Sequence, residues 1–195
     1  MRNNPIFVWS LQKIILSLIT KIKSIMKIIF LDIDGVLNSA EFAERHYNET
    51  GKGLFMTDFL DPDAVERMKR FFEEHEDVKF VLDSSWRYGN YVQTLNDLEN
   101  TGLKPLLQYM VGVTIRSYER IRGKEIRHFI ETMGKDESKK LWKDETPFII
   151  EKYVIVDDDA DMLDEQLPFF VHTDNYYGIT EDDYKKIEEI LYEKQ

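Results

Sequence analysis

The stretch Lys27–Asn38 reads KIIFLDIDGVLN, and the rest of the chain is organised around it. Its apolar run, Ile28–Leu31, has no polar alternation, which is typical of a strand buried on both faces of a parallel sheet. Asp32 and Asp34 follow two positions apart, so in an extended segment both carboxylates lie on one side of the backbone. Two such anions repel unless a cation or a proton separates them. Because open α/β sheets bind ligands at the carboxyl ends of their strands, the stretch predicts a ligand site.

The sequence Asp-Ile-Asp-Gly-Val after an apolar strand resembles the first motif of the haloacid dehalogenase-like (HAD) phosphohydrolases. The resemblance implies that Asp32 attacks phosphorus and that Asp34 acts as the general acid and base. It also implies a magnesium ion held by Asp32, by the backbone carbonyl of Asp34 and by a downstream Asp. The alternative interpretation is a polar turn after the strand, with a solvated Asx cap.

A second buried strand, Val78–Leu82, runs into the sequence DSSWR. HAD enzymes have a Ser or Thr hydroxyl at this position, where it binds a phosphate oxygen; Ser84 matches it best and Ser85 is the alternative. We expect Trp86 to stack on a base or to fill the rim of the site. We expect Arg87 to clamp a phosphate. Ordinary N-capping by either serine is the competing interpretation.

The sequence RIRGKEI opens an apolar helix that continues through Ile130. The third HAD motif is a basic residue at the start of such a helix, and its frequent Lys-Gly form aligns Arg122 with that cation. Lys124, two residues on, is the alternative. A solvated basic helix start is also consistent with the pattern, although cations are slightly disfavoured at a helix N-terminus.

The strand Tyr153–Val156 runs into the most acidic segment of the chain, DDDAD. Hard oxygen ligands directly after a buried strand suit a magnesium site. The resemblance aligns Asp157 and Asp161 with the fourth HAD motif, and Asp158 with a paired acid that binds the metal through water. A calcium-binding EF-hand is disfavoured because its spacing, central Gly and terminal Glu are absent. The predicted metal-binding residues are Asp32, Asp34, Asp157, Asp158 and Asp161.

The remaining segments supply the other predicted elements of an α/β fold. Asp61-Pro62 starts a helix with Asp61 as N-cap, and the helix ends near Glu76. Leu106–Thr114 is predicted as a strand, and so is Phe169–His172. Thr180 is predicted to cap the last helix, with Asp183 completing a capping box in which Asp replaces Glu.

The length, the composition and the net charge of the chain narrow the possible classes of protein further. The 195 residues fit one domain, and 43% hydrophobic residues favour a folded chain. The absence of cysteine excludes disulfides and thiolate zinc sites, which suits a cytoplasmic location. A net charge of −11 argues against stable binding of duplex nucleic acid.

Residues 1–25 form a basic amphipathic extension that contains four basic and no acidic residues. Membrane contact through this segment is one interpretation, and a helix packed on the domain is another. We favour an extension that is dispensable for chemistry, because Met26 stands directly before the first strand and is an alternative start. The HAD-like hydrolase domain is then predicted to span residues 26–195.

Four motifs in the HAD order predict a three-layer Rossmann-like α/β fold with a mainly parallel sheet, flanking helices and a minimal cap. The predicted function is a Mg²⁺-dependent phosphomonoester hydrolase that forms an aspartyl-phosphate. A nucleotide or a nucleic-acid end is the expected substrate, because little-capped HAD enzymes often accept bulky substrates. A subgroup of HAD domains associated with nucleic-acid repair modules resembles this chain most closely. The alternatives are a catalytically silent phosphate-binding module and a membrane-associated interaction protein.

Overall fold

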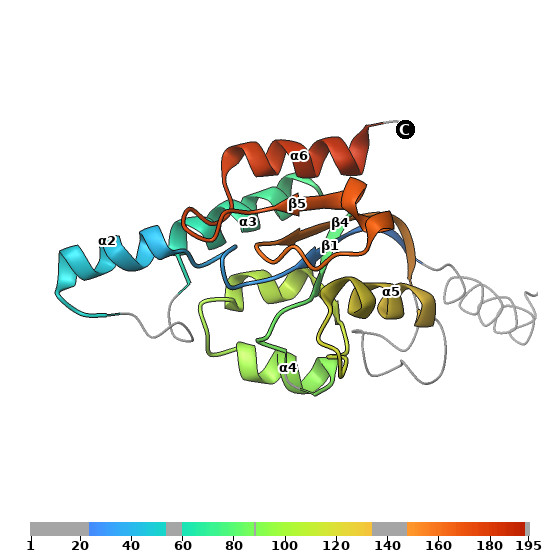
Figure 1. Cartoon of the computed structure of the whole chain (residues 1–195), viewed down its shortest axis with the longest axis horizontal. Coiled ribbons are helices and arrows are strands. Elements are labelled where there is room, and N and C mark those ends of the chain that lie inside the picture. The colour runs from blue at the N-terminus through green and yellow to red at the C-terminus, as the bar shows by residue number, and fades with distance from the viewer. Residues whose placement is uncertain (1–23, 54–59, 88, 134–147, 194–195) are drawn as a thin grey trace, which may run out of the picture.

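A computed structural model describes residues 24–53, 60–87, 89–133 and 148–193 of the chain. Five parallel strands form one sheet in the order β3-β2-β1-β4-β5 (Figure 1). The strands are β1 (Ile25–Leu31), β2 (Val78–Leu82), β3 (Met110–Val113), β4 (Ile149–Asp157) and β5 (Phe170–His172). This order makes β1 the central strand, so the segment from which the sequence analysis started is the middle of the sheet.

β1 is central because its side chains are apolar on both faces. Ile28, Ile29, Phe30 and Leu31 are completely buried. In the register of the sheet, Ile29 is paired with Phe80 of β2 on one side and with Val154 of β4 on the other. An uninterrupted apolar run is the pattern required of a strand that is covered by helices on both faces.

Helices cover both faces of the sheet, as Figure 1 shows. α3 (Pro62–Glu74) and α6 (Glu181–Tyr192) lie on one face, and α4 (Tyr91–Leu98) and α5 (Arg122–Thr132) lie on the other. Each helix buries an apolar stripe, such as Val65, Met68 and Phe72 of α3. The predicted three-layer α/β fold is therefore confirmed.

The helix starts follow the predicted capping chemistry. The Asp61 side chain accepts a hydrogen bond from the Asp63 amide at the start of α3, and Pro62 occupies the first turn. At the start of α6, Thr180 and Asp183 each accept a hydrogen bond from the other's backbone amide, forming the expected capping box.

The predicted strand Leu106–Thr114 is only partly a strand. Residues Lys104–Tyr109 form a 3₁₀ helix, η1, and only β3 is extended. Leu106 and Leu107 are adjacent and both buried, a pattern that a strand covered on both faces would also show. η1 packs beside α3, and the helical turn brings both leucines into the interior. A second 3₁₀ helix, η3 (Asp164–Phe169), precedes β5.

α2 (Ala40–Thr50) is the regular element that the structure describes between β1 and α3, and it buries no residue. It projects away from the sheet in Figure 1. This arrangement agrees with the predicted minimal cap. The predicted flap falls partly on residues 54–59, and the predicted amphipathic helix falls on residues 1–23; both segments lie outside the described residues. Within the described parts of the chain, every helix is too short or too polar to cross a membrane.

Candidate active site

Three carboxylates meet at the carboxyl ends of β1 and β4. Asp32, Asp157 and Asp158 each offer an oxygen, and these oxygens lie within 4.8 Å of one another. The parallel pairing of β1 with β4 causes this approach, since Leu31 is in register with Val156 and the Asp32 amide donates to the Val156 carbonyl at 3.0 Å. The sheet register thus brings together acids that are far apart in sequence.

Gly35 lets the third carboxylate of this cluster approach the first loop. Its φ of +69° is a left-handed conformation, and an added Cβ would lie 2.3 Å from the carboxyl carbon of Asp158. The Thr173 hydroxyl donates to the Gly35 carbonyl at 3.1 Å and ties the loop to the end of β5. A side chain at position 35 would therefore displace Asp158.

The pKa values of the three clustered carboxylates are raised, because burial disfavours their charged forms. Burial raises the pKa of Asp32 to about 7, against the opposing effects of the Arg122 charge and a hydrogen bond from Ser84. Burial and then the nearby Asp32 charge raise the pKa of Asp157 to about 8. Burial also raises the pKa of Asp158. Close oxygen ligands that share excess negative charge fit a hard divalent cation such as Mg²⁺.

Arg122 at the start of α5 is the cation that faces the cluster. Its Nη2 lies 3.0 Å from Asp32 Oδ1, its Nε lies 3.7 Å from Asp157 Oδ2, and its Nη1 donates to the Asp83 carbonyl at 2.6 Å. Lys124, the alternative cation, instead pairs with Glu119, and both of these side chains are substantially exposed. The structure thus brings Arg122 and not Lys124 to the cluster.

The two serines after β2 have separate neighbours. Ser84 is completely buried and hydrogen-bonds Asp32, whereas the Ser85 hydroxyl donates to Asp34 Oδ2 at 3.1 Å. Ser84 is therefore the serine beside the predicted nucleophile, and Ser85 is beside the predicted acid and base.

Asp34 is held by side chains from two segments. Besides Ser85, the Asn38 amide donates to Oδ1 at 2.9 Å, and the Trp86 indole N–H lies 3.0 and 3.1 Å from the two carboxylate oxygens. Trp86 is buried, so its ring supports Asp34 from within the protein instead of offering an open face to a base. These donors fix the orientation of the Asp34 carboxylate.

Arg87 is engaged in buried ion pairs and does not present an open guanidinium to a phosphate. Its Nη1 lies 3.0 Å from Asp83 and donates to the Ser84 carbonyl at 2.8 Å, and its Nη2 pairs with Glu125. Asp83, Arg87 and Glu125 are all buried. This network joins the end of β2 to α5, which is a positioning role different from the predicted clamp.

Asp161 lies at the N-terminus of α5, not among the three clustered carboxylates. Its Oδ2 accepts the Arg122 amide at 2.9 Å, and its backbone carbonyl accepts the Gly123 amide at 3.4 Å. Ile121, the N-cap residue, supplies no side-chain cap. Asp161 therefore caps α5 from another loop and complements the helix dipole.

Three supporting residues were absent from the sequence-based site: Asn38, Asp83 and Glu125. Asn38 stands at the end of the first motif and Asp83 directly follows β2, so their strand-end positions carried a signal. Glu125 looked like an ordinary acidic residue in the first turn of a helix, and only its burial reveals its function.

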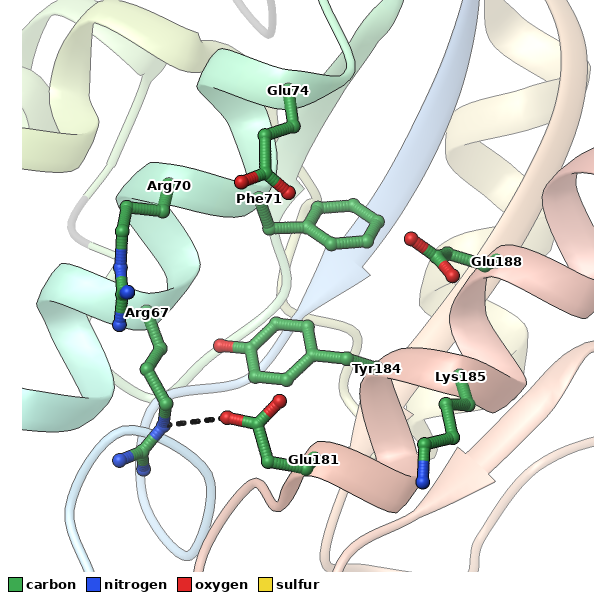
Figure 2. Close-up of a pocket in the computed structure, with 8 residues that line it drawn as sticks. All are labelled: Arg67, Arg70, Phe71, Glu74, Glu181, Tyr184, Lys185 and Glu188. Carbon is green, nitrogen blue, oxygen red and sulfur yellow. Dashed lines mark ion pairs between the residues drawn. The ribbon is translucent and has the colours of Figure 1, made fainter.

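A cavity of about 240 Å³ lies elsewhere, between α3 and α6 (Figure 2). Three basic residues and three acidic residues line it, and Arg67 approaches Glu181 at 4.0 Å. None of its lining residues belongs to the carboxylate cluster. Its balanced charge and its separate set of lining residues distinguish it from the candidate active site.

A parallel α/β sheet with clustered carboxylates at the ends of its first and fourth strands is the arrangement expected of a HAD domain. The chain belongs to the family described as "HAD domain in Swiss Army Knife RNA repair proteins", whose sequence model matches residues 28–184.

The chain was also compared with solved structures and with curated proteins. The structure is similar to that of the HAD domain of effector protein Lem4 from Legionella pneumophila, with 16% sequence identity and a TM-score of 0.46. The match covers 87% of this chain and 97% of the Lem4 domain. No curated protein gives a significant match.

Proposed function

We propose that this protein is a Mg²⁺-dependent phosphomonoester hydrolase that acts through an aspartyl-phosphate on Asp32. One observation carries the proposal: the oxygens of Asp32, Asp157 and Asp158 converge within 4.8 Å, with the Arg122 guanidinium against Asp32. The arrangement combines a buried nucleophile, a set of oxygen ligands and a fixed cation, which phosphoryl transfer requires. Membership of a HAD family supports the same chemistry.

Asp32, Asp157 and Asp158 would hold the magnesium ion, because they are the clustered oxygen donors of the described residues. When bound, Mg²⁺ would neutralise phosphate oxygens and offset the repulsion between the carboxylates. Burial is the main cause of the raised pKa values of Asp32 and Asp157, and the nearby Asp32 charge raises the pKa of Asp157 further.

The side chains of the protein divide the reaction into two steps. An Asp32 oxygen attacks phosphorus, the bond from phosphorus to the leaving oxygen breaks, and Asp34 gives that oxygen its proton. Asp34 then takes a proton from a water molecule, which attacks the phosphorus of the aspartyl-phosphate and releases phosphate and free Asp32. Arg122 and Ser84 hold negative oxygen atoms during both steps.

A phosphorylated nucleotide or a nucleic-acid end is the substrate class that we favour. α2 buries no residue and leaves a minimal cap, which suits a substrate that extends beyond the site. The description of the family, in RNA repair proteins, supports this choice. The net charge of −11 disfavours tight binding along a duplex.

The test is release of inorganic phosphate from a panel of nucleotides, 5′- and 3′-phosphorylated oligonucleotides, sugar phosphates and phosphopeptides. We expect Mg²⁺-dependent turnover that EDTA abolishes, that Asp32→Asn eliminates and that Asp34→Asn strongly reduces. Lys124→Ala serves as the matched control and retains activity. If the protein binds phosphate but hydrolyses none of these substrates, it is instead a catalytically silent phosphate-binding module.

A further inference from the structure

A cavity of about 140 Å³ beside the acidic cluster is lined mainly by arginines. Its lining residues are Arg87, Arg116, Arg120, Arg122, Glu125 and Asp159. Arg122 lines this cavity and also reaches the candidate active site, where its Nη2 lies 3.0 Å from Asp32. A group bound in this cavity would therefore be separated from the nucleophile by one side chain.

Two of the four arginines are already compensated by buried acids. Arg87 pairs with Asp83 and Glu125, and Arg122 pairs with Asp32. Arg87 is buried and held by its partners, so its guanidinium has little capacity for another anion. Arg122 is directed toward Asp32 in the candidate active site.

The other two arginines, Arg116 and Arg120, are exposed, and among the described residues neither side chain has a hydrogen bond or an ion pair. Arg116 is close enough to Arg87 for its charge to lower the pKa of Arg87, after the larger effect of burial. Two acids line the cavity with them: Glu125, which pairs with Arg87, and Asp159. The uncompensated charge is thus positive, in a protein whose net charge is −11.

A specific backbone structure holds these two arginines in place. We name residues 114–121, between β3 and α5, the arginine loop. The buried Glu125 carboxylate accepts the Ser117 amide, and the Ser117 hydroxyl accepts the Arg120 amide at 3.0 Å. Arg120 has φ = 55°, a left-handed conformation that is uncommon outside glycine. Such conformations persist where surrounding contacts impose them, often in ligand-binding segments.

We propose that Arg116 and Arg120 form a second phosphate subsite, which binds a phosphate that the substrate carries in addition to the one that is removed. The proposal rests on the proposed function and specifies its substrate: a phosphomonoester whose leaving group carries another phosphate, as in a nucleoside bisphosphate or at an oligonucleotide end. Guanidinium groups match phosphate oxygens in geometry and charge. Tyr118, fully exposed between the two arginines in sequence, offers a ring on which a neighbouring base can stack.

The test compares substrates with one and with two phosphate groups. The first group, with one phosphate, consists of p-nitrophenyl phosphate and adenosine 5′-monophosphate. The second group, with two phosphates, consists of adenosine 3′,5′-bisphosphate and a 5′-phosphorylated dinucleotide. We expect the double variant Arg116→Ala/Arg120→Ala to lower kcat/KM about tenfold or more for the second group, through loss of charge-assisted hydrogen bonds. We expect a change of less than about twofold for p-nitrophenyl phosphate, which has no group to reach the subsite.

Arg70→Ala is the matched control, because Arg70 is an exposed arginine that lines the separate cavity of Figure 2. This substitution also removes an arginine charge, and it should leave kcat/KM unchanged for both groups of substrates. An equal loss for all substrates with the double variant would overturn the subsite, since the arginines would then only shape the loop. An unchanged kcat/KM of the double variant for the substrates with two phosphates would overturn the subsite as well.

A binding measurement separates this proposal from the proposed function. Calorimetric titration of adenosine 3′,5′-bisphosphate into the Asp32→Asn protein with Mg²⁺ requires no turnover. If the wild-type protein hydrolyses no substrate, the proposed function fails, and the subsite stands only if the two arginine substitutions weaken this binding about tenfold. If the Asp32→Asn protein binds adenosine 3′,5′-bisphosphate equally well with and without the two arginine substitutions, the subsite is rejected, whatever the activity of the wild-type protein.

Discussion

The indole nitrogen of Trp86 lies within hydrogen-bond distance of both carboxylate oxygens of Asp34, at 3.0 and 3.1 Å. A buried aromatic residue thereby fixes the residue that we assign as general acid and base. Replacing Trp86 by Phe removes the donor and keeps an apolar ring. We expect kcat to fall about tenfold with little change in KM, because the carboxylate loses its fixed orientation.

Ser85→Ala provides the comparison for Trp86→Phe, since it removes a single and more exposed donor to Asp34. The loss of kcat should be smaller for this variant, and thermal unfolding checks that both variants are folded. A Trp86→Phe protein with undiminished kcat would mean that the indole does not orient Asp34.

Gly35→Ala should disrupt the metal site through a steric clash. The new Cβ would lie 2.3 Å from the Asp158 carboxyl carbon, in addition to the left-handed strain of about 1–2 kcal/mol. Gly51→Ala is the matched control, because Gly51 has the same φ of +69° and no atom within 4 Å of the added Cβ. We expect both variants to lose stability, whereas only Gly35→Ala loses the rise in Tm that Mg²⁺ produces. Equal responses to Mg²⁺ would contradict this role of Gly35.

Arg122→Lys should reduce activity at least about 100-fold, the typical cost of losing a fixed donor in such a site. The guanidinium contacts Asp32 and the Asp83 carbonyl at the same time, and an ammonium group cannot reproduce this fork. Lys124→Ala should stay within about twofold of wild type, since its exposed pair with Glu119 contributes about 0–1 kcal/mol. Phosphate release measured for both variants tests the assignment, which would be reversed if Lys124→Ala were the more damaging.

The metal-free protein should lose stability as the pH rises from about 5 to 8. The pKa values of Asp32 and Asp157 are raised to about 7 and about 8 in the folded protein, so the folded state binds more protons than the unfolded state in this range. Thermal unfolding in EDTA should therefore give a lower Tm at pH 8 than at pH 6. Mg²⁺ should raise Tm more at pH 8, where a larger fraction of the two carboxylates is ionised than at pH 6.

Asp157→Asn is the control for the pH dependence, because it removes one of the two repelling charges. Its Tm in EDTA should vary less with pH than that of the wild type. The linkage argument fails if the wild-type Tm in EDTA is constant or increases between pH 6 and pH 8.

The parts of the fold that could be predicted are those encoded in local patterns. The apolar runs of β1 and β2 and the capping residues Asp61 and Thr180 are local signals, and the structure agrees with them. η1 was missed because LLQY is apolar enough for a strand, and only packing beside α3 selects the helical turn.

For the site, the ends of the strands could be predicted but the partners of most side chains could not. The sequence placed acids after β1 and β4, and the parallel register brings Asp32 and Asp157 together. Contacts such as Trp86 with Asp34 and Arg87 with Glu125 join segments that are distant in sequence. They depend on side-chain rotamers and burial, which no local pattern specifies.

The order of the strands also constrains how the chain can fold during translation. β1 is synthesised well before one of its two neighbours, β4, which begins at Ile149. Until β4 has been synthesised, the edge of β1 that pairs with β4 has no partner, and unpaired strand edges of this kind are prone to aggregate. The repelling carboxylates of Asp32 and Asp157 meet only when β4 docks, so a divalent cation bound between them would favour this docking.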